Sequence, residues 1–284
     1  MRVRTLAFLF ALTSTALAVG QQASIAQETV VVPSGKLRLK AFLWKPTGPG
    51  PFPAVLFCHG SGGADAGHTA GLPITEAGEK LATLFLKHGY AFMYLFRRGQ
   101  GLSADQGRFM QNILQHEETA KGKEARQHLQ FVLASTDHLD DVMAGLSFLK
   151  AVPVIDAKRV AIAGHSFGGQ LTLLAAERDD TLRAAVAFAA AANSWEQSSE
   201  LRERLLTAVN KATAPIMLIH AANDYSTAPG YALASELDRL HKPHLLKVYP
   251  PVGRTSEDGH NFLYLASPRW EDDVFEFLDE HVKQ

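Results

Sequence analysis

The chain has 284 residues, of which 46% are hydrophobic and 20% charged, and its formal net charge is −1 at pH 7. This composition suits one large globular domain with a sizeable core and argues against an intrinsically disordered chain. Because the sequence has no basic stripe and no long run of like charges, it gives no electrostatic support to nucleic-acid binding.

The N-terminus has the pattern of an export signal. Two arginines within the first four residues precede an apolar run at residues 6–12. Small-x-small cleavage motifs end at Ala18 and Ala26, so we predict a signal peptide over residues 1–26 and a single mature domain over residues 27–284. The alternative is an uncleaved membrane anchor, but the run is short for a span of about 20 apolar residues. The expected location is periplasmic or secreted, without stable membrane insertion after cleavage.

The segment after the export signal predicts the first strands of a sheet. Residues 37–45 alternate between apolar and polar side chains, which indicates a half-buried strand at the edge of the sheet. Residues 54–58 and 91–96 are fully apolar and predict strands covered on both faces, with a helix at residues 75–88 between them. Cys58, the single cysteine, is predicted to be a buried small hydrophobe.

The loops after these two apolar strands carry glycine-rich and basic motifs. Residues 59–63 read His-Gly-Ser-Gly-Gly, and residues 97–103 read Arg-Arg-Gly-Gln-Gly-Leu-Ser. His59 is predicted to be a buried structural residue that holds its loop. Arg97 and Arg98 are predicted to brace the loops, and binding of an acidic substrate is the alternative.

Residues 103–138 interrupt the alternation of strands and helices. Connections of this kind commonly have about 2–6 residues, whereas this segment is much longer, charged and rich in helix-forming residues. We therefore predict a helical insertion. Two positions remain open for it: it overhangs the sheet, or it forms solvated helices without substrate contact.

From residue 139 onward, strands and helices alternate regularly. This alternation predicts parallel βαβ units, hence an α/β fold with a mostly parallel central sheet and helices on both faces. In such sheets, sites form beyond the carboxyl ends of the strands. The predicted strands are 159–163, 184–189, 216–220 and 245–249, and the predicted helices are 139–150, 167–178, 231–240 and 269–282, with a further single helix within 193–213.

Residues 164–168, Gly-His-Ser-Phe-Gly, stand between a predicted buried strand and a predicted helix. This strand–turn–helix setting is that of a nucleophile elbow. The crowded backbone of such a turn needs small neighbours, which the glycines at positions 164, 168 and 169 supply. The N-terminus of the following helix favours negative charge that develops at the serine. Ser166 is therefore the candidate nucleophile.

A serine hydroxyl needs a base within hydrogen-bond reach and a third group that fixes the tautomer of that base. Behind a nucleophile elbow, the chain order is serine, then aspartate or glutamate, then histidine. The candidate for the acidic residue is Asp224, which follows a predicted strand, and the candidate for the base is His260, which lies 36 residues later. Gly259 allows the loop at His260 to bend. The alternatives are a turn-forming role for Asp224 and an exposed loop position for His260.

Stabilising a tetrahedral intermediate requires two preorganised amide donors. One is predicted to be the backbone N–H of Phe167, directly after the serine. The other is predicted to come from the loop at residues 59–63, with Ser61 as first choice and Gly62 as second. Gly62 and Trp195 are the candidate substrate-binding residues, and Phe167 is a further candidate for the pocket. A packing anchor is the alternative role for Trp195.

Several other titratable residues fit this chemistry less well. His220 is predicted to serve packing, and the side chain of His165 is predicted to project away from the serine. Asp258 is close to His260 in sequence and is not expected to orient it. No His, Cys or Asp cluster has the spacing of metal ligands, so we predict neither a metal nor a cofactor.

Together these motifs, in this order, resemble the α/β-hydrolase superfamily, and most of all its dienelactone-hydrolase-related and prolyl-oligopeptidase-like branches. The resemblance covers roughly residues 30–284. Dienelactone hydrolases proper use a cysteine nucleophile where this chain has Ser166. Prolyl-peptidase relatives usually carry a large additional N-terminal domain.

The resemblance implies an α/β-hydrolase fold and a serine hydrolase that cleaves a small ester-like substrate through an acyl-enzyme. A serine peptidase, a thioesterase and a cofactor-free haloperoxidase are alternatives that would use the same residues. A non-catalytic binding protein on the same scaffold is an alternative of a different class.

Overall fold

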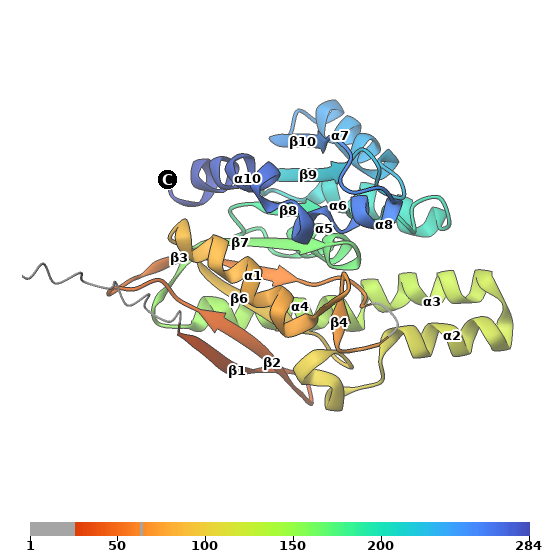
Figure 1. Ribbon diagram of the computed structural model, residues 1–284, viewed down its shortest axis with the longest axis horizontal. Helices are drawn as coiled ribbons and strands as arrows, with labels where there is room; N and C mark the ends of the chain where they lie inside the picture. The colour runs from red at the N-terminus through yellow and green to blue at the C-terminus, as the bar shows by residue number, and fades with distance from the viewer. Residues whose placement is uncertain (1–25, 63–64) are drawn as a thin grey trace, which may run out of the picture.

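The computed structural model, which describes residues 26–62 and 65–284, is built around one eight-stranded sheet (Figure 1). The strands lie in the order β1-β2-β6-β3-β7-β8-β9-β10. β2 pairs antiparallel with β1 and β6, and all the other neighbours in this sheet pair parallel. The mostly parallel sheet predicted from the sequence is confirmed. The predicted signal peptide lies outside the described residues, apart from Ala26.

Most strands occupy the predicted segments, with ends shifted by a few residues. Their apolar sequences follow from their position, because helices cover both faces of the sheet. The strands are β1 (Gln27–Ser34), β2 (Leu37–Trp44), β3 (Phe52–Cys58), β6 (Ala91–Phe96), β7 (Ile155–His165), β8 (Ala185–Phe188), β9 (Ile216–Ala221) and β10 (His244–Tyr249), and a separate small pair is formed by β4 (His68–Thr69) and β5 (Leu72–Pro73).

The prediction of an edge strand at residues 37–45 is wrong. β2 lies between β1 and β6, and it pairs with β1 from end to end. The β-branched run at residues 30–32 favours a strand. Gly35, at φ 57°, lets the chain reverse directly after that strand. β1 therefore takes the edge position, and the side chains of β2 are largely buried in the hydrophobic clusters on the two faces of the sheet.

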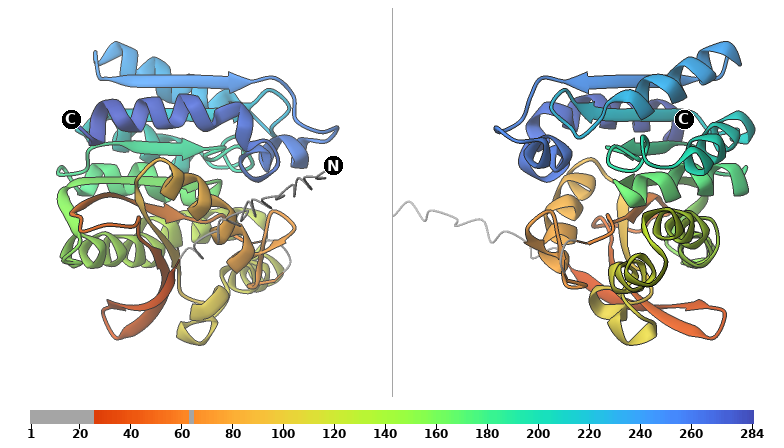
Figure 2. Two further views of the ribbon diagram at one scale, coloured as in Figure 1. Left: turned by 60° about the vertical axis from the view of Figure 1, so that its left-hand side comes forward. Right: turned by 90° about the vertical axis from the view of Figure 1, so that its right-hand side faces the viewer.

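Helices cover the two faces of the sheet (Figure 2). Successive side chains of a strand point to opposite faces, and in β3 Leu56 belongs to one hydrophobic cluster whereas Val55 and Phe57 belong to the other. None of the helices in the described part of the chain is long and apolar enough to span a membrane. On one face lie α1 (Ile74–Lys87) and α10 (Ser267–Val282), and on the other α4 (Asp137–Ala151), α5 (Phe167–Arg178), α6 (Ser199–Lys211) and α7 (Ala228–Arg239).

The predicted insertion folds into a helical hairpin at one end of the molecule, with its two helices side by side (Figures 1 and 2). A short 3₁₀ segment, η1 (Gly101–Gln106), leads into α2 (Met110–Lys121) and α3 (Lys123–Ser135). Gly122, at φ 93°, forms the turn between the two helices. Because α3 contacts α4, α5 and α6, the hairpin is anchored to the helices on one face of the sheet.

Candidate active site

Ser166 stands at a sharp turn between the end of β7 and the start of α5. Its backbone is at φ 58° and ψ −117°, a region that costs an L-residue about 1–3 kcal/mol. The surrounding structure holds this turn, since the Ser166 N–H donates to the carbonyl of Phe188 at 2.8 Å. The turn presents the hydroxyl beyond the carboxyl end of the sheet, at the N-terminus of α5.

Two glycines of the motif are required by close backbone approach. A Cβ at Gly168 would lie 1.9 Å from the carbonyl oxygen of Cys58. A Cβ at Gly164 would lie 2.4 Å from the carbonyl oxygen of Gly168. Any side chain at either position would therefore push α5 away from β3 and β7. Cys58 itself is buried, as predicted, and burial raises the pKa of its thiol to about 12.

The structure brings Ser166, His260 and Asp224 together, although they are far apart in the sequence. His260 Nε2 lies 2.8 Å from Ser166 Oγ. His260 Nδ1 lies 2.7 Å from Asp224 Oδ1. With Nδ1–H donating to the carboxylate, Nε2 is left to accept the serine proton. Asp224 follows β9, and His260 ends the short helix α8 (Ser256–His260).

A capping box fixes the helix that carries His260. The Thr255 side chain accepts from the Asp258 N–H, and the Asp258 carboxylate accepts in turn from the Thr255 N–H. Asp258 therefore caps α8 instead of orienting His260, in line with the sequence prediction. Gly259 lets α8 lie against the loop before Asp224, because a Cβ there would be 2.4 Å from the carbonyl oxygen of Asn223.

His220 does more than fill space, contrary to the sequence prediction. It is 1% exposed, and its Nδ1 lies 2.9 Å from Asp224 Oδ2, the oxygen that His260 does not contact. Burial by itself would raise the pKa of Asp224, but the hydrogen bonds with His220 and His260 outweigh burial and hold that pKa below its usual value. Both oxygens of the carboxylate are thus held, and Asp224 is kept ionised.

His165 contacts His260 instead of Ser166. Its Nε2–H donates to the backbone carbonyl of His260 at 2.8 Å, and the two rings lie 5.0 Å apart. Burial, together with the proximity of His260, lowers the pKa of His165 to about 3. His165 is therefore neutral at physiological pH and helps to hold the loop of His260.

Three buried histidines should make the protein sensitive to acid. Burial holds the pKa of His59 and His138 well below the usual value, as it does for His165. At a pH above the unfolded-state pKa of about 6.5, these histidines are neutral in the folded and in the unfolded chain. At a pH below that value, they take up protons in the unfolded chain only. The free energy of unfolding should therefore fall by about 1.4 kcal/mol per pH unit for each histidine between pH 6 and pH 4.5.

Urea denaturation at several pH values measures this slope. Replacing His138, which packs edge-on against the Phe167 ring, with leucine should make the slope shallower by about 1.4 kcal/mol per pH unit. An unchanged slope in His138→Leu would show that this histidine takes up a proton in the folded state.

The two loops that carry glycine-rich and basic motifs are joined by buried hydrogen bonds. The Arg97 guanidinium is buried and donates to the carbonyls of His59 and Gly60 at 2.6 and 2.8 Å. Gln100 Nε2 donates to the carbonyl of Ser61 at 2.9 Å. Arg98 donates to the buried carboxylate of Asp141 on α4. The prediction that both arginines brace loops is confirmed, and so is the structural position of His59.

The residues predicted to donate amides to an oxyanion lie beside Ser166. Ser61 and Phe167 line the same cavity as the serine. Phe167 is the first residue of α5, so its N–H is one of the four that have no acceptor within the helix. The Arg97 guanidinium carbon lies 5.4 Å from the centre of the Phe167 ring. Arg97 thus holds the loop that carries Ser61 and lies beside the Phe167 ring.

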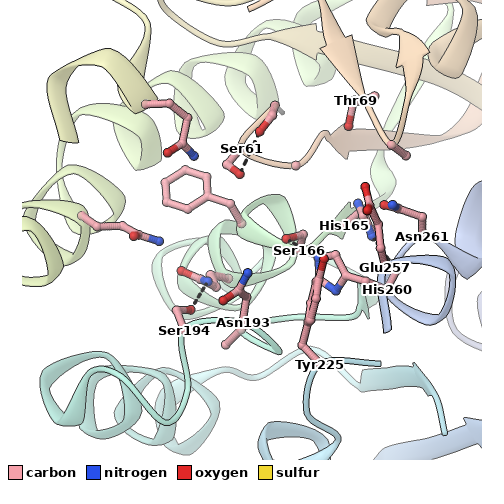
Figure 3. A pocket seen from close by; sticks show the side chains of 18 of the residues that line it. Ser61, Thr69, His165, Ser166, Asn193, Ser194, Tyr225, Glu257, His260 and Asn261 are labelled. Carbon is pink, nitrogen blue, oxygen red and sulfur yellow. Dashed lines mark hydrogen bonds between the residues drawn. The ribbon is translucent and has the colours of Figure 1, made fainter. Parts of the chain in front are cut away.

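Ser166 and His260 open into a cavity of about 400 Å³ (Figure 3). Gly62, a predicted substrate-binding residue, belongs to its wall. Trp195 is absent from the described residues that line the cavity. Trp195 is 5% exposed and belongs to the hydrophobic cluster that also contains Leu201 and Leu205 of α6. This placement corrects the substrate-binding prediction and matches the alternative of a packing anchor.

Most of the cavity wall was not predicted from the sequence, and much of it is polar. The helical hairpin supplies Gln111, Arg126 and Gln130, which favours the overhanging position of the insertion over the solvated one. Among the other lining residues are Thr69, Gln170, Asn193, Ser194, Gln197, Tyr225, Glu257 and Asn261. The one signal for Gln170 in the sequence is its spacing of four residues from Ser166 along a predicted helix.

The strand order, the strained serine turn and the helices on both faces define an α/β-hydrolase fold. Residues 39–267 match the dienelactone hydrolase family, and the chain therefore belongs to that family.

Known proteins similar to this chain include hydrolases of several kinds. The Quorum-quenching protein AidA of Acinetobacter baumannii is 27% identical over 153 residues, which are 54% of this chain and 40% of that protein. The acylaminoacyl peptidase of Pyrococcus horikoshii superposes with a TM-score of 0.66 at 17% identity, over 93% of this chain and 43% of the peptidase. A Klebsiella pneumoniae protein described as a dienelactone hydrolase superposes with a TM-score of 0.65 at 21% identity, over 92% and 99% of the two chains.

These similarities differ in what they cover. This chain spans less than half the length of AidA and of the peptidase. It spans nearly all of the Klebsiella protein, which is thus a neighbour of matching size. At these identities, the superpositions establish the fold.

Proposed function

We propose that this protein is a serine hydrolase that cleaves a carboxylic ester, with Ser166 as nucleophile, His260 as general base and acid, and Asp224 as the orienting group. One observation carries the proposal: hydrogen bonds of 2.8 and 2.7 Å run from Ser166 through His260 to Asp224 at the wall of a cavity. This arrangement can activate a hydroxyl that is otherwise a weak nucleophile at neutral pH.

The first half-reaction forms an acyl-enzyme. Ser166 Oγ attacks the ester carbonyl carbon while His260 Nε2 takes the hydroxyl proton. The carbonyl oxygen becomes an oxyanion, which the backbone N–H groups of Ser61 and Phe167 stabilise. The intermediate collapses as the C–O bond to the alcohol breaks, and His260 delivers its proton to the leaving oxygen.

The second half-reaction releases the acid. A water molecule takes the place of the alcohol and gives its proton to His260 while its oxygen attacks the acyl carbon. The ester bond to Ser166 breaks, and the serine recovers its proton from His260. Throughout the cycle, Asp224 stays ionised and holds the imidazole, and His220 holds the second oxygen of Asp224.

A fluorophosphonate probe tests the proposed nucleophile. The native protein should be labelled covalently at Ser166, because a serine that a neighbouring base has activated attacks the phosphorus of the probe, displaces fluoride and becomes phosphonylated. The Ser166→Ala variant should stay unlabelled, whereas Ser147→Ala, which changes an exposed serine of α4, should be labelled at the native rate. Mass spectrometry of the labelled peptide identifies the site. A folded native protein that stays unlabelled would count against the mechanism.

The same residues could act on other acyl compounds. A panel of short esters, a lactone, thioesters and aminoacyl amides would rank the bonds that the enzyme cleaves by kcat/KM. The ester assignment predicts the highest values for esters. If a thioester or an amide has the highest kcat/KM, the enzyme would be a thioesterase or a peptidase instead of an esterase. The proposed nucleophile would be the same. A haloperoxidase activity would appear as halogenation in the presence of peroxide, and binding without turnover would indicate a non-catalytic protein.

A further inference from the structure

We propose that the acyl part of the substrate is not a plain hydrocarbon but carries a neutral hydrogen-bond donor, an N–H or an O–H group, near the ester carbonyl, and that Gln170 accepts from it. This inference rests on the proposed hydrolase function. It assigns to Gln170 the role of a specificity-determining residue.

Gln170 is one helical turn from the nucleophile. Its backbone N–H donates to the carbonyl of Ser166 at 3.2 Å, and residues spaced by four lie on the same face of a helix, about 6 Å apart along the axis. The side chain is 3% exposed and lines the cavity. The Gln170 side chain is therefore part of the cavity wall beside an ester bound at Ser166.

The Gln170 carboxamide uses only one of its two ends within the protein. Its Nε2 donates to Ser194 Oγ at 3.0 Å, whereas its Oε1 is buried without a hydrogen-bond partner among the described residues. A buried acceptor left in this state costs about 1–3 kcal/mol. An N–H or O–H group of a bound substrate would satisfy it.

The part of the cavity wall next to Gln170 also consists of neutral polar side chains. A small side pocket adjoins the cavity, and the two share Gln130, Gln170, Ser194 and Gln197. All four of these side chains are uncharged and both donate and accept hydrogen bonds. Placing a hydrocarbon chain against them would remove water from these groups without replacing its hydrogen bonds. A neutral polar acyl group fits this wall better.

The position of the base decides which half of the ester meets this wall. His260 must deliver a proton to the leaving oxygen, so the alcohol lies on the His260 side of Ser166, where Figure 3 also shows Glu257 and Asn261. Asn193 and Ser194 lie on the other side of Ser166 in the same view. Ser194 is the partner of Gln170, and the acyl half therefore extends toward Gln170.

Two matched pairs of 4-nitrophenyl esters test the inference. The N-acetylglycine ester is compared with the 4-methylpentanoate ester, and the 3-hydroxybutanoate ester with the 3-methylbutanoate ester. Within each pair the size is similar and only one member has a donor. Each kcat/KM is divided by the rate of hydroxide-catalysed hydrolysis of the same ester, which removes differences in intrinsic reactivity. The first pair reports on an amide and the second on a hydroxyl.

The native enzyme should prefer the donor-bearing ester by about tenfold in at least one pair, as one hydrogen bond to a buried neutral group allows. Gln170→Leu should bring that ratio close to one. Gln115→Leu, on an exposed position of α2, should leave the ratio at the native value. Gln170→Met, with a more flexible side chain, is the second variant if the leucine variant does not fold.

A native enzyme that shows no preference in either pair would overturn the inference, and so would a Gln170 variant that keeps the native ratio. In both cases, turnover of all four esters and fluorophosphonate labelling would leave the proposed hydrolase function intact. If no ester is turned over and Ser166 stays unlabelled, the proposed function fails and this inference fails with it.

Discussion

Replacing Ser166 with alanine should lower the ester turnover number by about 10⁶ if the three hydrogen-bonded side chains act as one unit. In the proposed mechanism the hydroxyl is the group that bonds to the acyl carbon, and in the alanine variant His260 Nε2, which lies 2.8 Å from the native hydroxyl, would have no proton to take from it. The predicted oxyanion amides of Ser61 and Phe167 would remain, so hydrolysis above the rate in water should persist at a low level.

The measurement is kcat for a 4-nitrophenyl ester with purified protein, together with a urea denaturation curve. Ser147→Ala serves as the matched control, since it makes the same change on an exposed part of α4 and should keep the native rate. Loss of only a few-fold in a correctly folded Ser166→Ala protein would mean that another group attacks the substrate.

Replacing Asp224 with asparagine should lower kcat by about 10⁴. In the native protein one oxygen of Asp224 bonds with His260 and the other with His220. An asparagine can offer an acceptor to only one of these histidines, because its other end is an N–H₂ donor. If the N–H₂ group faces His260, it favours the tautomer in which Nε2 carries the proton and cannot act as a base.

The Asp224→Asn rate is best compared with that of Asp238→Asn, which changes an exposed aspartate of α7 and should have no effect. Combining Asp224→Asn with His220→Leu removes the competing histidine and leaves the amide oxygen free to face His260. Partial recovery of kcat in the double variant would support the tautomer explanation. A near-native rate in Asp224→Asn alone would show that another carboxylate orients His260.

The sequence predicts the elements of this fold and the grouping of three side chains because both leave local signals. A fully apolar run such as residues 91–96 predicts a strand covered on two faces, and β6 has those bounds. The turn at Ser166 can be recognised in the sequence from its flanking glycines. Glycine is required there because the backbones approach closely, as at Gly168. Asp224 and His260 could be found from chain order and from their positions after predicted strands.

The features that the sequence did not predict depend on tertiary packing. β1 carries a β-branched signal, but its role as the edge is set by pairing with β2. The burial of Trp195 away from the cavity depends on how the chain turns between β8 and α6. Gln130 reaches the cavity because α3 packs beside α5. His220 looks like a packing residue until the loop after β9 brings Asp224 back against it.

The burial of Cys58 has a practical consequence. This thiol lies at the end of β3, next to the backbone contact with Gly168, and stays protonated at neutral pH. Alkylating reagents attack the thiolate, so the intact protein should resist iodoacetamide, whereas opening of this contact exposes a cysteine of ordinary acidity. Because the chain has one cysteine, the rate at which iodoacetamide modifies the protein measures how often the contact between Cys58 and Gly168 opens. Modification of Cys58 would thus report local unfolding beside the proposed nucleophile.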